Sequence, residues 1–408
     1  MDLKYVLLKD CCSKIGSGAT PKGGKSVYIE KGTSFIRSQN VYNLFFSTKG
    51  LAYINDDAAN KLKGVTVREG DVLLNITGDS VARTCVVPNE VLPARVNQHV
   101  AIIRTNHSLD PYYLNYYLAS PAMQGYLLNI ASTGASRNAI TKGAIEKLSI
   151  PTPSLDVQRR IASILSAYDN LIENNNRRIR LLEQMAENLY KEWFVRFRFP
   201  GHEKAEFESG LPKGWKRNKI KEYYNTCSGG TPSREKNEYY NEGTIFWVKT
   251  GEIQDSLIQK TEELISTEGL KHSSAKILPK WTLLMAMYGV NIGKLGIITN
   301  EMSCNQAACA FIDKGSIPSV FYLFFYLKSI RSYLLSISFG AAQQNLSQVL
   351  IQNLRIVMPQ EDVLKSFDNV IRPLYNQICA LQQQSELLSR QRDLLLPRLM
   401  SGKLEVKV

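Results

Sequence analysis

An apolar repeat of unusual length constrains this chain more than any other feature of its sequence. Between residues 155 and 197, apolar side chains recur alternately four and three positions apart, which is the period of a coiled-coil seam. A helix of this length extends for about 60 Å at 1.5 Å per residue, and its single apolar stripe requires a partner helix. The predicted seam positions are Ile161, Leu165, Tyr168, Ile172, Asn175, Ile179, Leu182 and Leu189.

The partner helix lies in the same chain. A second seam follows the first at a constant offset of 206 residues (367 − 161), so that Phe367 corresponds to Ile161 and Leu395 corresponds to Leu189. Asn175 is the polar member of the first seam, and it either fixes the register as a buried side chain or faces solvent on a rotated helix. The second set of seam positions is Phe367, Ile371, Leu374, Ile378, Leu381, Leu388 and Leu395.

Each long helix follows a globular segment, and the two segments repeat one plan. The residues that match are mostly Gly, Pro and apolar residues, whereas the polar residues differ. One scaffold with two polar surfaces is what a protein that reads two different half-targets would need. The matches include SGATP (17–21) with SGGTP (228–232), Gly78 with Gly289, Asn97-Gln98 with Asn305-Gln306, and Tyr113-Leu114 with Tyr322-Leu323.

This duplication predicts an α+β fold. Two similar globular α/β domains would be separated by two long antiparallel helices, an intramolecular coiled coil with a pseudo-two-fold internal repeat. Within the first domain we expect strands at 65–67, 72–76 and 100–103 and an aromatic helix around 112–128. The predicted boundaries are 1–153 and 201–360 for the globular domains, with a leading linker at 201–215, 154–200 and 361–400 for the helices, and 401–408 for a tail.

The positive charge of the chain is concentrated in the globular segments. The net charge is +13. Residues 1–153 hold 17 Lys and Arg against 11 Asp and Glu, and residues 211–360 hold the same numbers, whereas the helical segments are nearly neutral. Two basic domains on a neutral frame indicate a polyanion that is bound at two places, and nucleic acid is the first candidate.

The sequence contains no motif of a catalytic, metal or cofactor site. The string at 18–26, GATPKGGKS, is one residue too long for a phosphate-binding loop, and no methyltransferase, triad or zinc-protease motif occurs. The seven cysteines and four histidines lack metal-ligand spacing. We therefore predict no catalytic residue, metal or cofactor. With no long apolar run and no signal-peptide pattern, a cytoplasmic protein without a membrane partner is expected.

Several motifs together resemble one family over the whole chain. QRDLLLPRLMSGKLEV (391–406), LPKGW (211–215), the paired SG-x-TP turns and the domain-helix-domain-helix order are similar to the specificity subunit of type I restriction-modification systems. The resemblance implies two target recognition domains, each reading one half of a bipartite asymmetric DNA sequence. It also implies that the helix pair sets the gap and docks two methyltransferase subunits.

The resemblance further implies a complete complex with restriction subunits. That complex would methylate adenine and, on unmodified sites, would use ATP to translocate and cut DNA, while the specificity subunit itself would be non-catalytic. Two other interpretations stay open on the residues alone. One is a coiled-coil scaffold or adaptor whose domains bind proteins, and the other is a standalone nuclease.

Candidate DNA-binding residues follow from the repeat. Arg or Lys reads guanine, and Asn or Gln reads adenine, so we look for these side chains near the Gly-rich turns. Each has an alternative role as a solvated turn charge or a helix cap. The candidates are Arg37, Ser80, Arg83, Arg137 and Asn138 in the first domain, and Lys249, Tyr288, Lys294, Gln343, Gln344 and Asn345 in the second.

The first long helix ends in an aromatic segment. Trp193, Phe194, Phe197 and Phe199 are more hydrophobic than the exposed end of a helix should be. We predict that this segment packs on a recognition domain or on a methyltransferase subunit.

Overall fold

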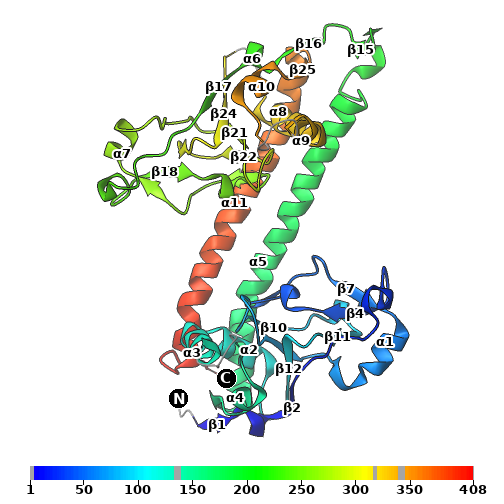
Figure 1. Ribbon diagram of the computed structural model, residues 1–408, viewed down its shortest axis with the longest axis vertical. Helices are drawn as coiled ribbons and strands as arrows, with labels where there is room; N and C mark the ends of the chain where they lie inside the picture. Colours follow the sequence, from blue (N-terminus) through cyan, green and yellow to red (C-terminus); the bar gives the residue numbers. More distant parts are fainter. Residues whose placement is uncertain (1–3, 133–138, 316–318, 339–344, 408) are drawn as a thin grey trace. The chain divides into compact units, whose positions relative to one another are not determined.

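The computed structural model describes residues 4–132, 139–315, 319–338 and 345–407 (Figure 1). The chain divides into two units. Unit 1 comprises Met1–Asn174 and Gln384–Val408, and unit 2 comprises Asn175–Gln383. The long helices α5 (Leu155–Tyr190) and α11 (Glu361–Met400) each contribute to both units. The predicted α+β fold with an internal repeat and two long helices is confirmed.

Unit 1 is built on two main sheets. Its strands are β1 Tyr5–Leu7, β2 Cys12–Ser17, β3 Tyr28–Ile29, β4 Thr33–Ile36, β5 Val41–Tyr42, β6 Phe45–Phe46, β7 Ala52–Ile54, β8 Thr66–Val67, β9 Val72–Asn75, β10 Thr84–Val86, β11 Ala94–Val96, β12 Val100–Thr105 and β13 Ser149–Pro151. One sheet is antiparallel with the order β10-β9-β12-β2. The other has the order β3-β7-β4-β11-β8, and its β4–β11 pair is parallel.

Short helices complete unit 1. They are α1 Asp56–Lys61, α2 Pro111–Ala119, α3 Pro121–Ser132 and α4 Lys142–Glu146. The expectation of one aromatic helix around 112–128 is wrong, because the chain forms two helices there. Ser120 adopts an extended conformation before Pro121, as the steric demands of a proline ring favour for the preceding residue. The three expected strands are confirmed as β8, β9 and β12.

Unit 2 repeats this plan. Its strands are β14 Phe207–Glu208, β15 Leu211–Pro212, β16 Lys216–Lys219, β17 Tyr224–Ser228, β18 Ile245–Val248, β19 Ser256–Ile258, β20 Leu264–Ile265, β21 Leu283–Ala286, β22 Leu295–Ile298, β23 Ser303–Cys304, β24 Ala308–Asp313 and β25 Arg355–Met358. The sheet β17-β24-β21-β22-β19 matches β2-β12-β9-β10, with β19 added at its edge. The sheet β20-β18-β23 matches β7-β4-β11, again with one parallel pair.

The helices of unit 2 follow the same order as those of unit 1. They are α6 Ile220–Tyr223, α7 Thr267–Lys271, α8 Val320–Ser329, α9 Arg331–Ser338 and α10 Gln348–Asn353. Helices α8, α9 and α10 correspond to α2, α3 and α4. Among the described residues no individual helix has the length and hydropathy to cross a membrane, and α8 with α9 meets that test only as a pair bent by 61°.

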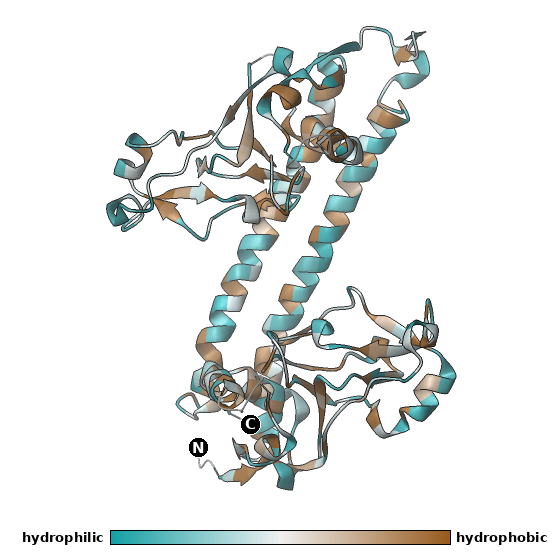
Figure 2. Cartoon of the chain, viewed as in Figure 1, coloured by the Kyte–Doolittle hydropathy of each residue, from teal (hydrophilic) through white to brown (hydrophobic). Residues whose placement is uncertain are grey.

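The two long helices run antiparallel within each unit. In unit 1, Ile161 and Leu165 near the start of α5 share a core with Leu396 and Leu399 near the end of α11. In unit 2 the opposite ends meet, since the core there includes the end of α5 and the start of α11. Figure 2 shows hydrophobic and hydrophilic residues alternating along both helices, as a one-sided apolar stripe requires.

The seam positions are covered to different degrees. Asn175 is buried, with 4% of its surface exposed. The other buried positions are Ile161, Leu165, Phe367, Ile371, Ile378 and Leu381. The half-buried positions are Tyr168, Ile172, Ile179, Leu182, Leu189, Leu374, Leu388 and Leu395.

The aromatic end of α5 packs into the core of unit 2. A single π-helical turn, Lys191–Val195, follows α5 and turns Trp193 and Phe194 into that core. The ring of Phe194 lies 4.7 Å from that of Tyr322 on α8 and 4.8 Å from that of Phe367 on α11. The prediction that this segment packs on a recognition domain is confirmed.

Candidate nucleic-acid interface

In both units the SG-x-TP turn packs closely against the Asn-Gln turn. A Cβ atom on Gly18 would lie 2.1 Å from a backbone oxygen of the facing turn, and one on Gly229 would lie 1.9 Å from such an oxygen. Only glycine permits this approach. A side-chain hydrogen bond also joins the turns, from the hydroxyl of Thr20 to Gln98 in unit 1 and from that of Thr231 to Gln306 in unit 2.

Three candidates of unit 1, Arg37, Ser80 and Arg83, lie around the β5–β6 hairpin. The buried amide of Asn75 connects two of them. It donates to the backbone of the 3-10 helix Ser38–Asn40 over 2.9 Å and to the Ser80 hydroxyl over 3.1 Å. Arg37 forms the N-cap of that short helix. Arg37 and Ser80 therefore have defined positions, with half-buried side chains.

The side chain of Arg83 rests on the hairpin. Its guanidinium carbon lies 4.8 Å from the ring centroid of Tyr42, a cation–π geometry. Tyr42 and Phe45 flank the turn and are 40% and 55% exposed. Leu44 between them has φ +62°, a left-handed conformation uncommon for leucine. Unit 1 thus presents a guanidinium beside two exposed aromatic rings.

Unit 2 has different groups at the equivalent positions. Lys294 takes the place of Arg83, and its ammonium group donates to the side-chain oxygen of Gln254. Asn291 takes the place of Ser80, and its amide donates to Thr250 O over 2.9 Å. The cation of this loop is therefore held by a polar hydrogen bond in unit 2, whereas it rests on an aromatic ring in unit 1.

A single β-bridge involves the loop between β9 and β10 in unit 1 and the loop between β21 and β22 in unit 2. Tyr288 bridges Asn345 in unit 2, and Thr77 bridges Ala139 in unit 1. Tyr288 is half-buried and Asn345 is exposed, so the structure brings these two candidates together. In unit 1 the hydroxyl of Thr77 lies 2.5 Å from Nδ1 of His99, a polar contact that the sequence did not indicate.

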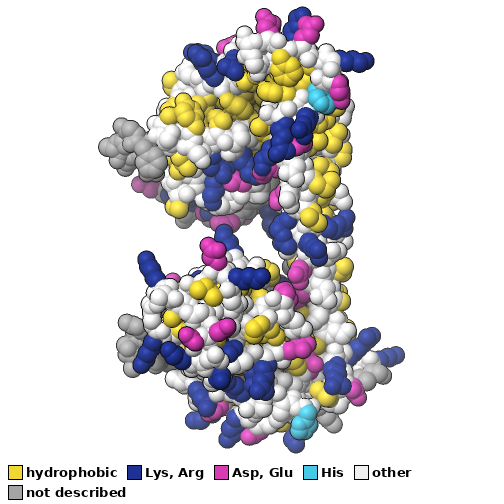
Figure 3. All heavy atoms as spheres, turned by 90° about the vertical axis from the view of Figure 1, so that its right-hand side faces the viewer, with side chains coloured by type: hydrophobic (Ala, Val, Ile, Leu, Met, Phe, Trp, Pro, Cys, Tyr) yellow, Lys and Arg dark blue, Asp and Glu magenta, His cyan; other side chains and the backbone are white. Residues whose placement is uncertain are grey.

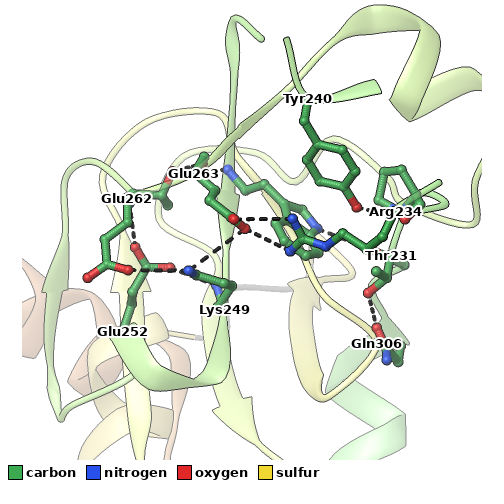
Figure 4. A network of polar contacts seen from close by, with 12 residues as sticks. Thr231, Arg234, Tyr240, Lys249, Glu252, Glu262, Glu263 and Gln306 are labelled. Atoms are coloured by element: carbon green, nitrogen blue, oxygen red, sulfur yellow. Dashed lines mark hydrogen bonds and ion pairs between the residues drawn. The ribbon is translucent and has the colours of Figure 1, made fainter. Parts of the chain in front are cut away.

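Lys249 lies in a network of acidic side chains (Figure 4). Its ammonium nitrogen is 3.2 Å from a carboxylate oxygen of Glu262 and 3.7 Å from one of Glu263. Arg234 binds the same Glu263 through two hydrogen bonds of 3.1 and 2.8 Å. The hydrogen bond to Glu262 raises the pKa of Lys249, and the hydrogen bond from Arg234 lowers the pKa of Glu263. Lys249 therefore stays protonated while two carboxylates share its charge.

Ion pairs within each unit neutralise part of the positive charge of that unit. Arg104 Nε lies 2.7 Å from the buried carboxylate of Asp71 in unit 1, and Arg331 Nη1 lies 2.9 Å from Asp255 in unit 2. On the face shown in Figure 3, Lys and Arg side chains stand among Asp and Glu on both units. This face therefore carries charges of both signs and not one uniform basic stripe.

Sequence reasoning missed several side chains that shape this surface. Arg234, two residues after the SG-x-TP turn of unit 2, lies over Tyr240 at 4.3 Å from the ring centroid. Asn75 holds its loop, but its counterpart in the repeat is the apolar Ala286, so comparison of the two copies did not single it out. Asn291 is the counterpart of Ser80, but its contact with Thr250 O depends on the tertiary fold. The pairing of the two turns could have been predicted, because Gln98 and its counterpart Gln306 are identical in the two copies. The candidates Arg137, Asn138, Gln343 and Gln344 lie outside the described residues.

The fold defines a class of proteins in which an α+β module followed by a long helix occurs twice in one chain. The sequence model of the type I restriction modification DNA specificity domain matches residues 2–184 and again 212–383. No group of three or more His, Cys, Asp and Glu side chains in the described ranges could hold a metal ion.

Known proteins resemble the chain along its length. The type I restriction enzyme MjaIX specificity subunit of Methanocaldococcus jannaschii is 24% identical over 406 residues, covering 97% of this chain and 92% of the relative. The HindI specificity subunit of Haemophilus influenzae is 22% identical, covering 91% and 94%. The crystal structure of a type I S subunit from M. genitalium shares the fold, with a TM-score of 0.63 at 13% identity and coverage of 98% and 96%.

This chain belongs to the type I restriction-modification DNA specificity family. It is a DNA-recognition subunit, and the two matched ranges correspond to its two modules.

Proposed function

We propose that unit 1 reads one half of a bipartite, asymmetric double-stranded DNA target and that unit 2 reads the other half. One observation carries this proposal: equivalent loops on one scaffold present different groups. Arg83 lies on the ring of Tyr42, whereas Lys294 bonds the amide of Gln254. Base edges are distinguished by the pattern of donors and acceptors offered to them, so two different sets suit two different half-sites.

The helix pair is proposed to set the gap between the half-sites. Helices α5 and α11 are each continuous and each belong to both units, so their length couples the two readers. We also infer that the helices dock two methyltransferase subunits. Exposed apolar side chains along them support this role, namely Leu171, Leu181, Met185, Leu387 and Leu394.

The chain itself would perform no catalysis. Adenine methylation and ATP-dependent cleavage would belong to methyltransferase and restriction subunits that bind it, and the complex would act on DNA in the cytoplasm. The methyl-donor and ATP sites would lie in those partners. This division of labour fits the absence of catalytic motifs from the sequence.

Genome-wide mapping of methylated adenines in cells that carry the complex would test the proposal. We expect one motif with two specified parts and a constant unspecified gap. A motif with one contiguous part would contradict it. An adaptor, the rival function, would show no DNA affinity at low salt, whereas the proposed reader should bind DNA with an affinity that falls steeply as salt rises.

A matched deletion tests the role of the helices. Removing one heptad from each of α5 and α11 would shorten the pair by about 10 Å, or about three base pairs. The gap in the methylated motif should shrink while both half-sites keep their sequences. Altered half-sites with an unchanged gap would contradict the assignment.

A further inference from the structure

A pair of side chains connects the basic loop of each unit to a short helix and to a neighbouring turn. The basic loop is residues 76–83 between β9 and β10 in unit 1 and residues 287–294 between β21 and β22 in unit 2. We call the connecting pair the latch. It consists of Asn43 and Gln124 in unit 1 and of Asp255 and Arg331 in unit 2.

The latch of unit 1 is uncharged. The amide nitrogen of Gln124, on α3, donates to Ala82 O in the basic loop over 2.8 Å. The amide nitrogen of Asn43, in the hairpin turn, donates to the side-chain oxygen of Gln124 over 3.2 Å. The oxygen of Asn43 in turn accepts from the backbone N–H of Thr84 over 3.1 Å. One residue thus binds the loop, and the other binds the strand after the loop.

The latch of unit 2 makes equivalent contacts with charged groups. Arg331, on α9, donates from Nε to Gly293 O in the basic loop over 2.9 Å. Its two terminal nitrogens donate to the two carboxylate oxygens of Asp255. Asp255 accepts from the backbone N–H of Leu295, the first residue of β22, over 3.0 Å. An amide pair in one unit is replaced by a bidentate ion pair in the other.

The latch bonds the residue that precedes the basic side chain, and one of its own members follows the partner of that side chain in the sequence. Ala82 and Gly293 directly precede Arg83 and Lys294. Tyr42 and Gln254, the partners of those two cations, directly precede Asn43 and Asp255.

We propose that Asn43 with Gln124, and Asp255 with Arg331, are positioning residues that orient Arg83 and Lys294 toward DNA. This inference rests on the proposed function. It adds that each half-site depends on its own latch and that the members of a latch can be exchanged only as a pair.

The chemistry of the two latches explains why a pair is required. Asn43→Asp keeps the acceptor for Thr84 but places a carboxylate opposite the oxygen of Gln124. If the Gln124 amide rotates to donate to the new carboxylate, it loses its bond to Ala82 O, so the basic loop is released. Adding Gln124→Arg restores a donor for both acceptors, as in unit 2. Asp255→Asn likewise needs Arg331→Gln.

Selection from a randomised pool of duplex DNA by the full-length chain, followed by sequencing, tests this inference. The wild-type chain should enrich a two-part motif. Asn43→Asp should weaken enrichment of one half-site by about tenfold, the scale of one lost base contact, and leave the other half unchanged. Asn43→Asp with Gln124→Arg should recover to within about twofold. Asp255→Asn alone should weaken enrichment of the other half-site by a similar factor, and adding Arg331→Gln should restore it.

A matched control and separate outcomes make the result decisive. Asn60→Asp applies the same chemical change to an exposed residue of α1 and should alter neither half-site. The inference is overturned if Asn43→Asp changes neither half, weakens both halves equally, or is not recovered by the second substitution. A wild-type chain that enriches no two-part motif would instead contradict the proposed function, and the inference would fall with it.

Discussion

The two units share a scaffold but differ in where they bury charge. In unit 1, Asp71, which directly precedes β9, is fully buried and accepts two hydrogen bonds of 2.7 Å from Arg104. Strand register places Thr282 and Ile312 at these positions in unit 2, where no charge is buried. Unit 1 therefore pairs two opposite charges at this position, whereas unit 2 has two uncharged residues there.

The helix pair shows the same contrast. In unit 1, Arg392 on α11 binds Asp169 on α5, and the hydroxyl of Tyr116 donates to the same carboxylate. The positions offset by 206 residues in unit 2 are Ala186 and Tyr375, and both are buried in the hydrophobic core of that unit. A buried charge without its partner is strongly destabilising. The units have therefore diverged by exchanging sets of contacting residues, and single exchanges should be costly.

The largest expected effect concerns the helix end in each core. Trp193, in the turn that follows α5, is buried in the core of unit 2, and Leu399 of α11, at the offset of 206 residues, is buried in the core of unit 1. We expect Trp193→Ala to lower the free energy of unfolding of unit 2 by about 3–5 kcal/mol through lost burial and the cavity that remains. Urea unfolding followed by tryptophan fluorescence measures it, because all 4 tryptophans of the chain lie in unit 2.

Met185→Ala on the same helix is the matched control. Its side chain is 57% exposed, and its removal should change the unfolding free energy by no more than about 0.5 kcal/mol. If Trp193→Ala had as small an effect, the aromatic end of α5 would not belong to the core of unit 2.

The long helices and the duplication could be predicted because a 3.5-residue period and a repeat are properties of the chain itself. Arg37 and Lys249 could likewise be matched across the repeat, and each caps the equivalent short helix of its own unit. Their surroundings could not be predicted, because Gly50 and Glu262 come from turns that only the tertiary fold brings close. The latch could not be predicted for the same reason, because its members lie on separate elements and differ in residue type between the two copies.

A second prediction addresses the buried ion pair of unit 1. Asp71→Ala leaves Arg104 unpaired at the edge of the core and should lower the stability of unit 1 by about 3 kcal/mol. Asp71→Thr combined with Arg104→Ile copies the residues of unit 2 and should cost less than the single change. Native-state hydrogen exchange of peptides that span β9 and β12 reports on unit 1. A double variant less stable than Asp71→Ala would show that the two solutions are not interchangeable.

A third prediction separates the two readers. Arg83→Ala should weaken binding to one half-site by about 1–3 kcal/mol, and Lys294→Ala should do so for the other, if each side chain contacts a base. Competition between duplexes altered in one half at a time measures this difference. Equal losses on both halves would indicate that these side chains contact only phosphates, in which case the salt dependence should also weaken.

The smallest expected effect tests an exposed contact between α5 and α8 in unit 2. Glu187 lies 2.7 Å from Lys328 and 2.7 Å from Lys191, and hydrogen bonds from Lys191 and Lys328 lower its pKa. Because the folded pKa is depressed, the stabilisation is present above the unfolded value of about 4.3 and is lost as the pH falls through the folded pKa.

Glu187→Gln should therefore cost less than about 1 kcal/mol at pH 7, since the carboxylate is one-third exposed and screened by solvent. The difference from wild type should shrink as the pH falls through the lowered pKa of Glu187, because the wild-type side chain then becomes neutral, as glutamine is. Lys328→Met should be non-additive with Glu187→Gln, because both changes remove one contact. A difference that grew at acidic pH would mean that Glu187 is stabilised in its neutral form, and the ion pair would then contribute nothing to unit 2.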